Sequence, residues 1–112
     1  MDKDIFTRSI TVNVADDATP EIYFRNLSAY QSVQVVLEWS GLGALLGTAK
    51  LEERTGAGNF VDIPTLAVNL DSIADTVALQ HRDFGGKDIR VSIDFKAAGV
   101  GTLTATLIAK TR

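Results

Sequence analysis

The sequence predicts an all-β domain, an antiparallel β-sandwich of about eight strands with a jelly-roll-like or immunoglobulin-like topology. Apolar and polar residues alternate along most of the chain, as they do in strands that bury one face. Turn residues recur about every 10–12 positions, and no helical period is sustained. A single domain over residues 1–112 is expected, because this length is typical of one domain and no linker or repeat interrupts it.

The alternation divides the chain into short extended segments separated by proline and glycine. In order, the predicted strands cover residues 9–14, 22–25, 33–39, 48–54, 60–63, 66–70, 76–80, 89–96 and 102–109. Pro20 separates the first two, the glycine-rich segment 55–59 forms a hairpin loop, and Pro64 stops the strand that returns from it. The segment 71–75 is too short to form a stable helix.

Two of the predicted strands have features that indicate how they are covered. The strand at 33–39 places Trp39 in its inward row and the apolar Val36 in its outward row, which predicts a central strand covered on both faces. The last strand carries no charge before Lys110, although isolated monomers usually protect edge strands with charges or proline. It either pairs inside the sheet or is covered by another chain.

Composition excludes several classes of protein. The net charge is −3 and no basic tract is present, so nucleic acid is not expected as a partner. No apolar run approaches the roughly 20 residues that span a bilayer, so no membrane span is expected. The acidic N-terminus lacks an apolar segment after it, so we expect no signal peptide and synthesis in a host cytoplasm.

The residue inventory offers little for catalysis or metal binding. There is no cysteine and one histidine, His81, which lies among charged residues at a strand end and is interpreted as a surface histidine. The aspartates Asp16, Asp17, Asp71 and Asp75 match no calcium loop and are interpreted as solvated turn residues. We therefore predict no enzyme activity, no catalytic residue, no metal site and no cofactor.

Two uncharged stretches are predicted to contact other protein chains. The apolar part of residues 41–49 either folds over the end of the sandwich or meets a neighbour, and the outward side of the last strand is uncharged. The candidate interface residues are Leu42, Leu45, Leu46, Thr102, Thr104, Thr106 and Ile108.

The order of several segments resembles small β-sandwich proteins encoded among bacteriophage structural genes. The segments that carry the likeness are Ile22–Leu27, Val35–Leu42, Gly47–Glu53, Phe60–Ile63, Phe84–Val91 and Gly101–Ala105. The likeness spans about residues 22 to 109, and it departs at Phe60, where many such chains carry a second tryptophan. The resemblance implies a virion protein of the capsid, decoration, spike or tail-associated type and transfers no active site.

These observations lead to one functional expectation and one alternative. The chain is expected to be a phage structural protein located on the virion, forming homo-oligomers and contacting other virion proteins by burial of apolar surface and added strand pairing. The alternative is a carbohydrate- or receptor-binding module, for which Tyr23 and Tyr30 are the plausible exposed aromatic residues. Trp39, in an inward row, is expected to belong to the core.

Overall fold

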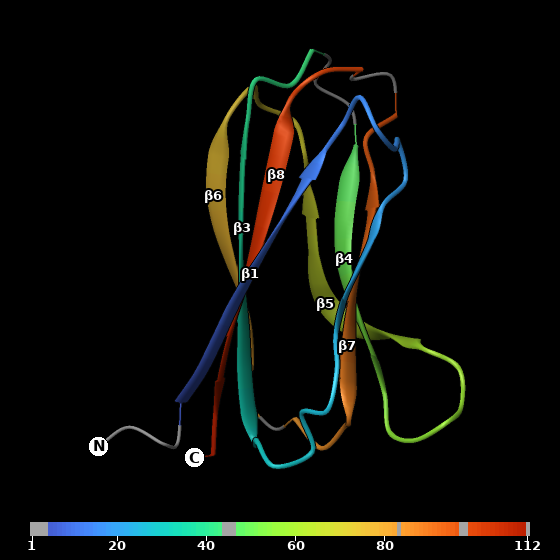
Figure 1. Ribbon diagram of the computed structural model, residues 1–112, viewed down its shortest axis with the longest axis vertical. Coiled ribbons are helices and arrows are strands. Elements are labelled where there is room, and N and C mark those ends of the chain that lie inside the picture. The colour runs from blue at the N-terminus through green and yellow to red at the C-terminus, as the bar shows by residue number, and fades with distance from the viewer. Residues whose placement is uncertain (1–4, 44–46, 83, 97–98, 112) are drawn as a thin grey trace.

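The computed structural model describes residues 5–43, 47–82, 84–96 and 99–111 and contains eight strands in two four-stranded sheets. The strands are β1 (Ile5–Asn13), β2 (Glu21–Phe24), β3 (Ser32–Ser40), β4 (Thr48–Arg54), β5 (Val61–Asn69), β6 (Asp75–His81), β7 (Asp88–Asp94) and β8 (Thr102–Lys110). Every pairing is antiparallel, and the two sheets face one another across the core (Figure 1). The prediction of an all-β antiparallel sandwich is confirmed.

The strand order selects one of the two predicted topologies. The sheets run β1-β8-β3-β6 and β2-β7-β4-β5, so the first strand pairs with the last, the second with the seventh, the third with the sixth and the fourth with the fifth. This nested pairing is that of a jelly roll, in which a folded-over hairpin is wound into two sheets. An immunoglobulin order would distribute the strands differently.

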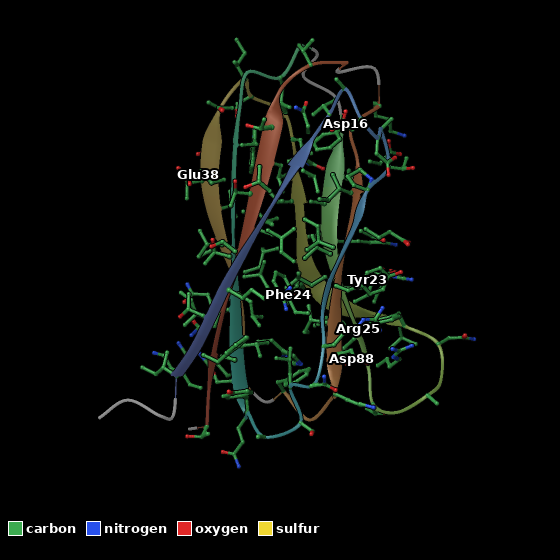
Figure 2. All side chains as sticks on the ribbon, in the orientation of Figure 1. Asp16, Tyr23, Phe24, Arg25, Glu38 and Asp88 are labelled. Atoms are coloured by element: carbon green, nitrogen blue, oxygen red, sulfur yellow. The ribbon has the colours of Figure 1, made fainter. Side chains whose placement is uncertain are left out.

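The core lies between the two sheets and is made by the inward rows that the alternation predicts. Val35, Leu37 and Trp39 of β3 are buried, as are Leu103 and Leu107 of β8. Phe24 points inward from β2 in Figure 2, while its neighbour Tyr23 points to the outside. The side chains of successive strand residues point to opposite faces, so each strand gives one row to the core and one to the surface.

Two features of the strands differ from the predictions. Pro64 does not end a strand, because β5 continues through it. The register of β5 against β4 shifts between Lys50 and Glu52, and Thr65 adopts a φ of 66°. Bulges of this kind allow a proline within an edge strand. The strand β3 is central, as predicted, but its outward row is not covered by any other layer of the described chain, so Val36 is half-buried.

Close approach of the backbone at one end of the sandwich requires glycine. Gly101, which precedes β8, has a φ of 115°, and a Cβ atom there would lie 2.8 Å from the carbonyl oxygen of Ser40. A side chain at this position would therefore collide with the end of β3 and strain the backbone.

Candidate protein interface

The outer surface of the β1-β8-β3-β6 sheet is a broad array of small, uncharged side chains. We call it the hydroxyl face, because threonine and serine dominate it. It consists of Ile5, Thr7, Ser9, Thr11 and Asn13 of β1, Thr102, Thr104, Thr106, Ile108 and Lys110 of β8, Ser32, Gln34, Val36, Glu38 and Ser40 of β3, and Thr76, Ala78 and Gln80 of β6. Of these residues, Glu38 and Lys110 alone are ionisable, and Glu38 points away from the core in Figure 2.

The register of the sheet arranges this face in rows across the four strands. One row runs from Thr11 through Thr104 and Glu38 to Thr76, and the next from Ser9 through Thr106 and Val36 to Ala78. The Oγ1 atoms of Thr11 and Thr104 are 2.7 Å apart, and Ser9 Oγ lies 2.8 Å from Thr106 Oγ1. Cross-strand hydroxyl pairs of this kind hold the side chains in a fixed pattern.

The centre of the hydroxyl face is its most apolar part. Val36 lies between Thr106 and Ala78 in its row, and Ile108 lies one row away. Both Val36 and Ile108 are half-buried although no other strand covers them, because neighbouring side chains on a sheet shield one another. A surface with so few charges is typical of the interior of a protein contact, where charged residues are depleted.

A shallow depression marks one end of the hydroxyl face. It has a volume of about 450 Å³ and is bordered by Glu38, Asp75 and the hydroxyl groups of Thr102 and Thr104, among other residues. Trp39 also borders it, although Trp39 is 2% exposed and its Nε1 donates a hydrogen bond to the carbonyl oxygen of Ser72. Trp39 is therefore a core residue, as the inward row predicts.

The seven candidate interface residues do not share one location in the structure. Thr102, Thr104, Thr106 and Ile108 all lie on the hydroxyl face, and β8, which carries them, pairs on both edges, with β1 and β3. The last strand is thus uncharged because it lies inside the sheet. Leu42 is 4% exposed and packs in the core, so its candidacy as a surface contact is corrected; Leu45 and Leu46 lie outside the described residues.

The outer surface of the other sheet has the opposite character, and we call it the charged face. Arg90 Nε lies 2.7 Å from Glu52 Oε1, Arg54 Nε lies 2.8 Å from Asp88 Oδ2, and Lys50 Nζ lies 3.2 Å from an oxygen of Asp62. Asp88 is 2% exposed, because Arg54 and the loop at Asn26 cover it, and it also accepts a hydrogen bond from the backbone N–H of Asn26. Alternating positions within β4 and β7 bring these charges together.

Aromatic rings and arginines pack together on the charged face, around Tyr23 and Phe60. The guanidinium groups of Arg54 and Arg90 each lie within 4.6 Å of the centre of the Phe60 ring, and Arg25 lies 4.5 Å from that of Tyr23. The rings of Tyr23 and Phe60 meet edge to face, with their centres 5.7 Å apart. Sequence reasoning missed this cluster, because its members come from three strands and two loops, and the alternation does not reveal which of these lie together.

Two buried carboxylates on the charged face have lowered pKa values. Burial alone would raise the pKa of Glu52, but hydrogen bonds from Arg90 and Ser92 outweigh it. Burial would likewise raise the pKa of Asp88, and the hydrogen bonds from the Asn26 backbone and from Arg54 outweigh it there. Both carboxylates are therefore stabilised in the ionised form.

These shifts predict acid sensitivity. A carboxyl whose pKa is lower in the folded than in the unfolded state takes up protons more readily when unfolded, so the stability it contributes is present at neutral pH and is lost as the pH falls below about 4.5. We expect the midpoint of urea unfolding to fall between pH 6 and pH 3. The Asp88→Asn variant, followed by circular dichroism over the same range, should show a smaller fall. Equal pH dependence in the two proteins would contradict this assignment for Asp88.

The remaining candidates for chemistry do not gather into a site. His81 ends β6, and its Nε2 lies 3.5 Å from Glu53 Oε1 on the other sheet. Within the described ranges, no group of three or more histidine, cysteine, aspartate or glutamate residues is placed to hold a metal ion. The same residues include no helix of the length and apolarity that a membrane span requires.

Comparison with known proteins finds similarity at the level of the fold. No family model matches the chain, and no curated protein matches its sequence. The K2 adhesin domain of Lys-gingipain is similar in structure, with a TM-score of 0.59 at 8% identity over 97% of this chain and 89% of that one. The SPBc2 prophage-derived protein YomS has a TM-score of 0.56 at 12% identity, over 94% and 93% of the two chains.

A CBM4 structure also shares the sandwich. Its TM-score is 0.50 at 9% identity, and the match covers 78% of this chain but spans only 56% of the length of that one. Because identities this low show the fold alone, these likenesses establish a β-sandwich that phage, adhesin and carbohydrate-binding proteins also use.

Proposed function

We propose that this chain is a structural protein of a bacteriophage virion, a capsid, decoration, spike or tail component that works by binding other protein chains. The observation that carries the proposal is the hydroxyl face, a sheet surface with two ionisable side chains, Glu38 and Lys110, among its described strand residues, on a protein whose opposite face is densely charged. Because the cores of protein interfaces are depleted of charged residues, a face with so few of them is suited to contact with another chain.

The sequence resemblance and the fold both accord with this role. Jelly rolls recur in viral capsid domains, and the prophage-derived YomS has the same kind of sandwich along nearly its whole length. The proposed action is burial of the hydroxyl face against other copies or other virion proteins, without a reaction. We infer accordingly that the protein is not an enzyme and acts without a cofactor.

The test of this proposal is a charge placed at the centre of the hydroxyl face. In Val36→Lys an ammonium group would be buried without a partner in any contact made through this face, so we expect self-association to weaken at least about tenfold, which corresponds to about 1.4 kcal/mol. Sedimentation equilibrium over a wide concentration range measures the change.

The control is the same substitution at a site outside the face. Val61 on β5 is 58% exposed, so Val61→Lys should leave association unchanged. A wild-type chain that stays strictly monomeric at the highest concentrations and does not bind purified phage particles would overturn the proposal, as would equal effects of the two lysine variants.

The alternative of a carbohydrate-binding module has weaker support. Tyr23 and Tyr30 are each half-buried, and both rings are engaged, Tyr23 with Arg25 and Phe60 and Tyr30 with Phe6 at a centre distance of 6.0 Å. Binding on a glycan array that is lost in Tyr30→Ala would favour the alternative.

A further inference from the structure

The two sheets have four edges, and three of them carry features that prevent pairing with another strand. The strand β2 is only four residues long. The strand β5 contains Pro64 and a bulge at Thr65, and β6 lies against β5 with Asp75 and His81 at its ends. Short length, proline, bulges, end charges and cover from a neighbouring element are the usual means by which proteins block edge-to-edge association.

The fourth edge, β1, has almost none of these features. It is nine residues long, it is regular throughout its register with β8, and its other edge pairs with no strand of the described chain. Arg8 is its one charged residue. Ile5 and Phe6 are 43% and 37% exposed, so apolar side chains as well as backbone groups are accessible along this edge.

We propose that β1 pairs antiparallel with β1 of a second copy of this chain, about a two-fold axis at Ser9, joining the two β1-β8-β3-β6 sheets into one. A two-fold axis perpendicular to the sheet places each residue opposite one on the same face, so Ser9 faces Ser9 of the second copy. Within the described part of the chain, these nine residues form the one long, regular edge that the fold leaves open. The inference concerns this strand edge and does not depend on what covers the hydroxyl face.

The sequence of β1 fits itself in this register. On one side of the sheet Thr7 lies opposite Thr11 of the second copy, and on the other side Phe6 lies opposite Val12, so these pairs match hydroxyl with hydroxyl and apolar with apolar. The pairs of Ile5 with Asn13 and of Arg8 with Ile10 are mixed in character. All nine residues of β1 take part in the pairing. The hydroxyl face then continues across the junction without a break.

Arg8 selects this register over its neighbour. A two-fold axis at Arg8 would set the two guanidinium groups directly opposite one another, which is unfavourable for like charges in a sheet. With the axis at Ser9, Arg8 faces Ile10 of the second copy and the two charges are separated. The single charge on the edge therefore favours the self-complementary pairing.

The absence of cysteine from the chain permits a direct test of this register. Residues opposite one another in an antiparallel pair have Cα atoms about 4.5–5.5 Å apart, within the range that a disulfide bridges. Under mild oxidation Ser9→Cys should form a covalent dimer at least about tenfold faster than Asn69→Cys, an exposed strand residue on the other sheet. Non-reducing gel electrophoresis measures the rate, and circular dichroism confirms that each variant folds.

A second pair of variants tests the register independently of Ser9. Thr7→Cys alone and Thr11→Cys alone should cross-link poorly, because like residues lie about 13 Å apart along the strands, whereas a mixture of the two should cross-link readily. Equal rates for Ser9→Cys and Asn69→Cys, or a mixture no faster than the single variants, would overturn the proposal. Introducing Val36→Lys into Ser9→Cys should leave cross-linking intact, so failure of this edge and failure of the hydroxyl face are distinguishable.

Discussion

Replacing Trp39 by alanine is expected to lower the free energy of unfolding by about 4 kcal/mol, the range found when large buried aromatic residues are truncated. Trp39 is 2% exposed in the inward row of β3, and its Nε1 donates a hydrogen bond of 3.1 Å to the carbonyl oxygen of Ser72. The variant loses both the packing of the indole between the sheets and the partner of that carbonyl. Urea unfolding followed by far-ultraviolet circular dichroism measures the loss.

Two companion measurements separate packing from ligand binding at this residue. Trp39→Phe keeps most of the volume and loses the hydrogen bond, so its cost should be nearer 1–2 kcal/mol, about the value of one hydrogen bond and a small cavity. Trp39 is the single tryptophan, so its fluorescence in the wild type reports this site alone. A loss below about 1 kcal/mol in Trp39→Ala, or emission that shifts on adding sugars, would contradict a core role.

Replacing Asp88 by alanine is expected to destabilise the fold by about 3 kcal/mol, because it leaves the charge of Arg54 without its buried partner. The same carboxylate accepts a hydrogen bond of 3.0 Å from the backbone of Asn26, a residue held at a φ of 64°. Asp88 thus joins β7, β4 and the loop that follows β2. Removing it frees both the guanidinium group and the loop.

Two further variants serve as controls for Asp88→Ala. Asp88→Asn keeps an acceptor for Asn26 and should cost less than the alanine variant. Asp62→Ala breaks an ion pair with Lys50 in which the side chain of Asp62 is 63% exposed, and exposed pairs contribute about 0–1 kcal/mol. If Asp88→Ala cost no more than Asp62→Ala, the buried pair would not be the stabilising link that its geometry indicates.

The two faces differ in how their polar groups are satisfied. Charged residues on β4 and β7 neutralise one another within the chain, so the charged face needs no partner. On the hydroxyl face, two pairs of hydroxyl groups between β1 and β8 are hydrogen-bonded, whereas the outer edge of β1 pairs with no strand of the described chain. A second strand on that edge would pair its exposed backbone groups, and a face with few charges can be covered with little desolvation of charged groups.

Some features of this protein follow from the sequence by itself. Alternation in β3, β7 and β8 determined the fold class and the inward rows, including Trp39, because burial of one face imposes a period of two on any strand. The outward placement of Thr104 and Thr106 followed from the same period. The uncharged character of β8 was visible too, although the sequence left open whether the sheet or another chain covered it.

Only the tertiary structure decided which strands lie next to one another. Pairing joins residues far apart in the chain, such as Ile5 with Lys110, and local patterns carry no record of it. For that reason the sequence left open whether β8 pairs inside the sheet, which it does, while the open edge belongs to β1. It also left open whether Leu42 folds over the sandwich or meets a neighbour, and the structure buries Leu42 in the core. Periodicity specifies which way a side chain points, and the winding of the chain specifies what it meets.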